Sequence, residues 1–125
     1  LQGDQVAMYA PVLRKHALEP HNQGPLTEFT GYGESDYPPC GDKLKLWVLV
    51  EGDVIQNVSF VAAGCGPLTA VASLATDWLK GKTVEQAKQL DSFELDRLAG
   101  GLPPAKRHVY LLLQDSLNLA LVRLT

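Results

Sequence analysis

Two hydrophobic runs joined by a glycine-containing turn constrain the fold of this sequence more than any other feature. In residues 44–50 apolar side chains recur at every second position, and residues 54–61 repeat the same period. A period of two is typical of strands with one buried face, and a three-residue connection that contains Gly52 favours an antiparallel hairpin. A hairpin brings the beginning of its first strand close to the end of its second. The residues that flank the two runs are therefore expected to be neighbours in space.

The remaining sequence predicts helices and one further strand around this hairpin. Apolar residues at helical spacing indicate helices over residues 4–18, 67–80 and 91–99 and from residue 108 onward, and Thr83 with Gln86 matches the capping box of a short helix. Pro11 either breaks the first helix or lies in its first turn. Residues 26–35 contain Gly31 and Gly33 and predict a short edge strand, because glycine weakens central strands. We expect one domain over residues 1–125.

Composition argues against several classes of function. The formal net charge of −3 is unfavourable for nucleic-acid binding, which selects basic surfaces. No apolar run is long enough to span a membrane, so no membrane association is expected. Two cysteines are too few for a secreted disulfide scaffold. These observations predict a cytoplasmic protein with reduced thiols.

The two cysteines lie in short glycine-flanked loops at the ends of the predicted hairpin. Cys40 and Asp42 come before its first strand, and Cys65 follows its second strand. The hairpin should therefore bring these three residues together. His108 stands one residue away from the apolar stripe of the last helix, in the first turn, where its side chain can reach a neighbouring loop. Two thiolates, an imidazole and a carboxylate suit tetrahedral zinc and also iron–sulfur chemistry.

Other interpretations of these residues stay open at this point. One cysteine could be buried and the other idle, or Cys65 and His108 could form a nucleophilic pair, although no oxyanion partner is evident. Cys65 precedes a predicted helix N-terminus, where the helix dipole is expected to lower the pKa of a thiol. His16 and His21 flank a helix stop rich in proline and are interpreted as solvent-facing or loop-bracing side chains.

Several motifs occur in one order along the chain. They are Cys40-Gly41-Asp42, the hairpin, Gly64-Cys65-Gly66, residues 78–87, residues 102–108 and the earlier Asn22-x-Gly24. Together they resemble the family of iron–sulfur cluster assembly scaffolds of the IscU and NifU amino-terminal type. The resemblance is collinear over residues 5–123.

This resemblance implies an α+β fold, a small three-stranded antiparallel sheet with helices packed on one side. It implies a scaffold rather than an enzyme: a cysteine desulfurase delivers sulfur, a 2Fe-2S cluster is built, and acceptor iron–sulfur proteins receive it. By position, the ligands of the cluster, or of iron, or of zinc in the isolated protein, are Cys40, Asp42, Cys65 and His108, and the aspartate tunes cluster lability. The segment Leu102–Lys106 resembles the site that an Hsp70-type chaperone recognises in some members.

One position departs from the family pattern. The family has a third cysteine directly after the histidine, and here that residue is Val109, the first residue of the apolar stripe of the last helix. Valine cannot accept a persulfide or ligate iron, and its side chain is expected in the core. Three interpretations follow: an atypical working scaffold, a relative that binds zinc or iron and docks to desulfurase or chaperone without building clusters, or a structural domain without metal.

Overall fold

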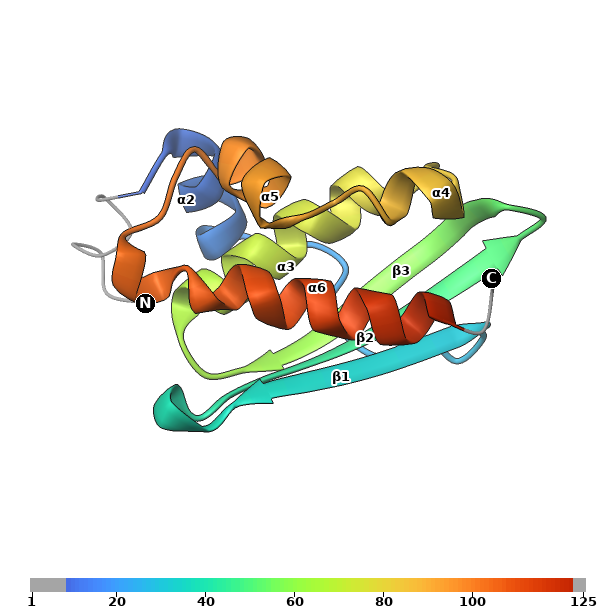
Figure 1. Ribbon diagram of the computed structural model, residues 1–125, viewed down its shortest axis with the longest axis horizontal. Helices are drawn as coiled ribbons and strands as arrows, with labels where there is room; N and C mark the ends of the chain where they lie inside the picture. Colours follow the sequence, from blue (N-terminus) through green and yellow to red (C-terminus); the bar gives the residue numbers. More distant parts are fainter. Residues whose placement is uncertain (1–8, 123–125) are drawn as a thin grey trace.

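A three-stranded antiparallel sheet carries helices on one of its faces in the computed structural model, which describes residues 9–122 (Figure 1). The strands, in the spatial order β1-β2-β3, are β1 (Gly31–Tyr37), β2 (Asp42–Glu51) and β3 (Val54–Ala63). The helices are α2 (Pro11–Leu18), α3 (Gly66–Leu79), α4 (Val84–Ala87), α5 (Ser92–Ala99) and α6 (His108–Leu121), with 3-10 turns η1 (Pro38–Cys40) and η2 (Pro104–Lys106). The predicted α+β fold is confirmed.

The predicted hairpin is formed by β2 and β3. The two strands pair antiparallel, with Leu46 opposite Phe60 and Lys43 opposite Ala63. Gly52 has a φ of 65° in the turn, a left-handed conformation that glycine adopts without strain. Alternate residues of β2 from Asp42 to Val48 are buried. The period of two in the sequence therefore gave the correct buried face.

The first helix and the edge strand differ from their predicted bounds. Helix α2 begins at Pro11, because proline lacks a backbone N–H and fits the first helical turn, so the helix does not extend back over residues 9 and 10. Residues 4–8 of the predicted helix lie outside the described residues. The edge strand β1 covers residues 31–37 instead of 26–35, since its pairing with β2 continues as far as Tyr37 opposite Asp42.

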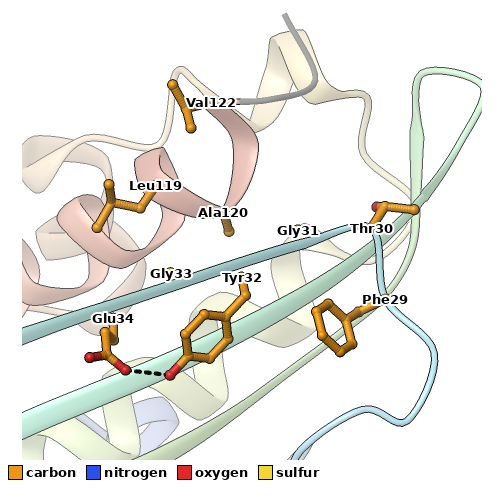
Figure 2. Close-up of a pocket in the computed structure, with 9 residues that line it drawn as sticks. All are labelled: Phe29, Thr30, Gly31, Tyr32, Gly33, Glu34, Leu119, Ala120 and Val122. Carbon is orange, nitrogen blue, oxygen red and sulfur yellow. Dashed lines mark hydrogen bonds between the residues drawn. The ribbon is translucent and has the colours of Figure 1, made fainter.

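Helix α6 lies directly on β1 (Figure 1). A Cβ atom at Gly31 would lie 1.9 Å from the carbonyl oxygen of Ala120, and one at Gly33 would lie 2.0 Å from that of Ser116. The glycines thus let the helix backbone approach the strand. Figure 2 shows the C-terminal end of α6 against β1, beside a pocket of about 410 Å³. The side chain of Tyr32 points away from the helix.

The remaining helices follow the sequence closely. The capping box of α4 is present: Thr83 accepts the Gln86 backbone N–H, and the Gln86 side chain accepts the Thr83 N–H. Asp91 caps α5 by accepting the Glu94 N–H. The predicted apolar stripe of α6 is entirely buried: Val109, Leu112, Leu113, Ser116, Leu117, Ala120 and Leu121. Together with the buried face of the sheet, this stripe and α3 form the core.

Candidate functional site

Three segments converge at the open end of the hairpin, on the left in Figure 1: η1, the β3–α3 connection and the beginning of α6. Cys40 ends η1 and is exposed. Gly41 follows with a φ of 69° and turns the chain into β2, whose first residue is Asp42. The Asp42 side chain is fully buried, although it lies at the end of the sheet.

The carboxylate of Asp42 joins the three segments. Its Oδ1 accepts the backbone N–H of Cys65 at 2.9 Å, and the Cys65 thiol donates to Oδ2 at 3.3 Å. The same Oδ2 lies 2.6 Å from Nε2 of His108. Gly64 makes this approach possible, because it has a φ of 130° and a Cβ there would lie 2.1 Å from Oδ1 of Asp42. A side chain at residue 64 would collide with Asp42, so the position before Cys65 requires glycine.

The pKa of Asp42 reflects these partners. Burial would raise the pKa of a carboxyl group, since it penalises the charged form. Hydrogen bonds from His108 and Cys65 favour the carboxylate and outweigh burial, so the pKa of Asp42 lies below its usual value. The side chain of Asp42 is therefore ionised and can offer a negative charge to a metal cation.

Cys65 is the residue that precedes the first turn of α3. Burial raises the pKa of its thiol, the carboxylate of Asp42 raises it further, and the backbone N–H of Leu68 only partly offsets these effects. The helix N-terminus does lower this pKa, as expected, through the Leu68 N–H, but burial and the contact with Asp42 outweigh it, so the net shift is upward and the thiolate is not favoured. A bound metal ion would reverse the balance, since coordination deprotonates a thiol.

His108 is the first residue of α6, as predicted, and its side chain reaches the loop that holds Asp42. Its ring stacks on Tyr37 with a centroid distance of 4.3 Å and an interplanar angle of 21°. Only 10% of the His108 side chain is exposed. Stacking on one side and the carboxylate on the other fix the orientation of the imidazole.

The four predicted site residues lie at one place. Single ligand atoms of Cys40, Asp42 and His108 all lie within 4.8 Å of one another. Cys65 adjoins this group through its 3.3 Å contact with Asp42. Sulfur, nitrogen and carboxylate ligands in this proportion suit zinc or iron. Val109 is fully buried in the core, as its place in the stripe predicted.

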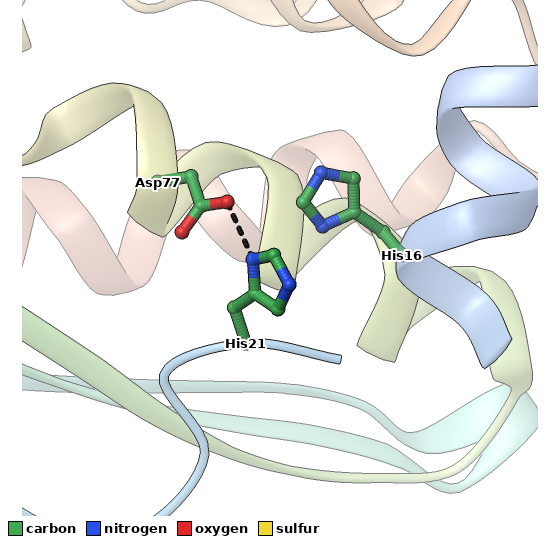
Figure 3. Close-up of side chains that lie close together, drawn as sticks. All are labelled: His16, His21 and Asp77. Carbon is green, nitrogen blue, oxygen red and sulfur yellow. Dashed lines mark hydrogen bonds and ion pairs between the residues drawn. The ribbon is translucent and has the colours of Figure 1, made fainter. Parts of the chain in front are cut away.

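The sequence did not indicate a second cluster, formed by His16, His21 and Asp77 (Figure 3). His16 is buried and so is not solvent-facing, whereas His21 pairs with Asp77 and braces the loop. Burial, as the largest effect, lowers the pKa of His16. The two histidines flank a helix stop, but no feature of the sequence relates Asp77 to them.

One further structural observation concerns membranes. Across residues 9–122, every helix is too short or too polar to cross a lipid bilayer.

Comparisons with known proteins agree with this architecture. The model of the NifU-like N terminal domain family matches residues 8–124. A relative from Aquifex aeolicus, named iron-sulfur cluster assembly scaffold protein IscU, is 38% identical over 108 residues, which cover 85% of this chain and 69% of the relative. A relative of the same name from Rickettsia prowazekii is 37% identical over 117 residues, which cover 90% and 88%.

The fold recurs in solved structures. The crystal structure of a candidate iron-sulfur cluster assembly scaffold protein for the SUF system from Fervidobacterium islandicum superposes with a TM-score of 0.75. The two chains are 19% identical, and the match covers 96% of this chain and 99% of the other. This likeness shows a shared fold. The family model and the relatives, which match in sequence, show the family. The chain therefore belongs to the NifU-like N-terminal domain family.

Proposed function

We propose that this protein is a scaffold on which an iron–sulfur cluster is assembled, held transiently and passed to acceptor proteins. The observation that carries the proposal is the group of potential ligands centred on Asp42. Cys40, Asp42 and His108 place ligand atoms within 4.8 Å of one another, with Cys65 beside them. The cluster is the cargo of this site, and the chain acts as its carrier rather than as an enzyme.

The proposed ligands have different roles. The thiolates of Cys40 and Cys65 are the soft ligands that iron–sulfur clusters favour. Asp42 and His108 supply harder oxygen and nitrogen ligands, and their mutual contact competes with metal binding. A 2Fe-2S cluster on this set should be labile, which suits transfer. Zinc fits the same residues in the isolated protein.

The surroundings of the site suit the proposed partners. A hollow of about 510 Å³ adjoins His108 and is lined in part by Tyr37, Phe93 and Leu111. We assign this surface to the cysteine desulfurase that supplies sulfur. The neighbouring residues Pro103, Pro104 and Ala105 are exposed and available to an Hsp70-type chaperone. The free thiols fit a reducing compartment, in line with the cytoplasm.

Val109 favours a second candidate function. The side chain at this position is fully buried and offers no soft ligand. A relative with one thiolate fewer could hold zinc or iron and dock to desulfurase or chaperone as a regulatory module, without building clusters. The two functions differ in whether sulfide is retained at the site.

Anaerobic reconstitution with iron, L-cysteine and a desulfurase distinguishes the two functions. A scaffold gives visible sulfur-to-iron charge-transfer absorption, which is lost in the Cys40→Ser and Cys65→Ser variants. A protein that gives no such bands, yet binds one equivalent of zinc, is the module and not the scaffold. Zinc binding thus serves as the control for a folded site.

A further inference from the structure

Two histidines and an aspartate gather away from the thiols, with His16 buried and His21 and Asp77 exposed (Figure 3). His16 comes from the last turn of α2, His21 from the loop that follows, and Asp77 from α3. One ligand atom of each lies within 4.8 Å of the others. Nδ1 of His21 is 2.7 Å from Oδ2 of Asp77, and the rings of His16 and His21 meet edge to face at 5.2 Å.

A second layer of hydrogen bonds orients these side chains. Ser73 Oγ lies 2.6 Å from Nδ1 of His16 and also accepts the backbone N–H of His21 at 2.7 Å. Asn22 donates to Oδ1 of Asp77 at 2.8 Å, which leaves Oδ2 directed at His21. Partners of this kind fix ring orientation and carboxylate direction around metal ligands.

The loop that carries His21 is held from two sides. Asn22 has a φ of 63°, a left-handed conformation that asparagine tolerates better than most residues with a side chain. Its side chain donates to Thr76 on α3, while its carbonyl oxygen accepts the Phe60 N–H of β3 at 2.9 Å. These two contacts hold the backbone of the loop, while the exposed side chain of His21 can still rotate.

The geometry needs only a small adjustment to hold an ion. Tetrahedral zinc with bonds of about 2.0–2.1 Å separates its ligand atoms by about 3.3 Å. The 2.7 Å contact of His21 and Asp77 must open slightly, and His16 must approach them. The side chains of His21 and Asp77 are 47% and 40% exposed, so both can rotate. Solvent on that side supplies the remaining ligand positions.

This cluster is separate from the site around Asp42. Cys65 precedes the first turn of α3 and Asp77 lies near its last turn, and a rise of 1.5 Å per residue places them about 18 Å apart. The two clusters therefore share a helix but no ligand. Two ammonium groups oppose a cation nearby: that of Lys15, which acts on His16, and that of Lys80, which bonds to Oδ1 of Asn22 at 2.5 Å rather than to the carboxylate.

We propose that His16, His21 and Asp77 form a second metal site, which binds one divalent transition-metal ion of the zinc type through two imidazoles and a carboxylate. Three protein ligands with solvent in the open position are typical of zinc, and the same set also accommodates iron(II). The proposal does not depend on cluster assembly, because it uses none of the residues assigned to that function.

The test uses the full chain with the first site removed by Cys40→Ser, Cys65→Ser and His108→Gln. The sequence has three histidines, so this background retains His16 and His21 as its only imidazoles. Calorimetric titration with Zn²⁺ should show one ion bound per chain. Imidazole NMR resonances of both histidines should shift during the titration, and Co²⁺ should give a d–d spectrum without thiolate bands.

His21→Arg is the sharpest variant, because arginine keeps a hydrogen-bond donor for Asp77 but has no lone pair for a metal. In the same background it should weaken zinc binding at least tenfold, as should Asp77→Asn, and Ser73→Ala should weaken it about 10–100-fold through the orientation of His16. Asp115→Asn on α6 removes an exposed carboxylate elsewhere and is the matched control, with no effect expected.

Two results of the binding titrations would overturn the proposal, and so would one result of the NMR titration. The first is an absence of zinc binding by the background protein. The second is undiminished affinity in a folded His21→Arg variant, with folding checked by circular dichroism. If that variant does not fold, the NMR titration still decides, since unshifted His16 and His21 resonances in the background protein exclude the site.

Discussion

Nε2 of His108 lies 2.6 Å from Oδ2 of Asp42, which joins the first residue of the last helix to the first residue of the central strand. The carboxylate also accepts the backbone N–H of Cys65. It is buried and has a pKa below its usual value, so it is a fixed negative charge between a thiol and an imidazole. The first two predictions concern this site.

Replacing Asp42 by asparagine should lengthen the lifetime of a reconstituted cluster. Asparagine has nearly the same shape and still accepts the Cys65 N–H, but it removes a hard anionic ligand that holds His108 away from the metal. The decay of visible absorption in air measures the lifetime. His108→Gln, which removes the other partner, is the paired variant, and an Asp42→Asn lifetime equal to that of the unaltered protein would refute the tuning role.

Val109→Cys should raise the yield of cluster per chain. The new thiol adds a soft ligand directly after His108, at the cost of moving a side chain that is now fully buried. Val109→Ser has the same shape as the cysteine variant without its sulfur, so it controls for disruption of the core. Equal iron and sulfide contents in the cysteine and serine variants would mean that residue 109 does not reach the metal.

Gly64→Ala should destabilise the fold more than Gly52→Ala. Both glycines have positive φ, and for alanine a left-handed conformation costs about 1–2 kcal/mol. A Cβ at Gly52 meets nothing within 4 Å, whereas at Gly64 it would lie 2.1 Å from Oδ1 of Asp42. Urea denaturation should therefore give a loss above about 3 kcal/mol at Gly64. Similar losses of stability in the two variants would show that the loop around residue 64 can shift to accommodate the added Cβ atom.

Tyr32→Phe should remove part of the loss of stability at high pH. Partial burial and the hydrogen bond to Glu34 raise the pKa of Tyr32 from 10.0 to about 12. Between these values the unfolded chain releases the phenol proton and the folded chain retains it, so the free energy of unfolding falls as pH rises. Below pH 10 the contribution is fully present.

Urea denaturation of both proteins across this pH range measures the effect. The stability of the unaltered protein should fall more steeply between pH 10 and 12 than that of the phenylalanine variant. Parallel curves would contradict the assignment to Tyr32. The phenol and Glu34 lie on the side of β1 away from α6, so the substitution leaves the helix contact in place (Figure 2).

Much of the fold and the candidate site could be predicted because local sequence determined them. The period of two fixed the hairpin, and a hairpin necessarily brings the flanks of its strands together, so Cys40, Asp42 and Cys65 were expected as neighbours. The stripe of α6 placed Val109 in the core and left His108 free to reach Asp42, and both placements agree with the structure.

Long-range contacts and the burial of single side chains could not be predicted from local sequence patterns. The raised pKa of Cys65 depends first on the burial of its own thiol and then on its contact with the Asp42 carboxylate, which no spacing reveals. The pairing of His21 with Asp77 joins residues 56 positions apart through the packing of α2 and its loop against α3. The end of β1 was misplaced because its last residues, Asp36 and Tyr37, have no apolar alternation and are ordered by pairing with β2.

The contact between α6 and the glycines of β1 has a consequence for how the site can open. With the carbonyl oxygens of Ser116 and Ala120 seated against the strand, a sliding helix would drive side chains into backbone atoms. Helix α6, whose first residue is His108, is thereby held against β1. In the proposed scaffold this contact does not hold the two short loops around Gly41 and Gly64, so we expect exchange of a bound cluster to depend on the motion of these loops.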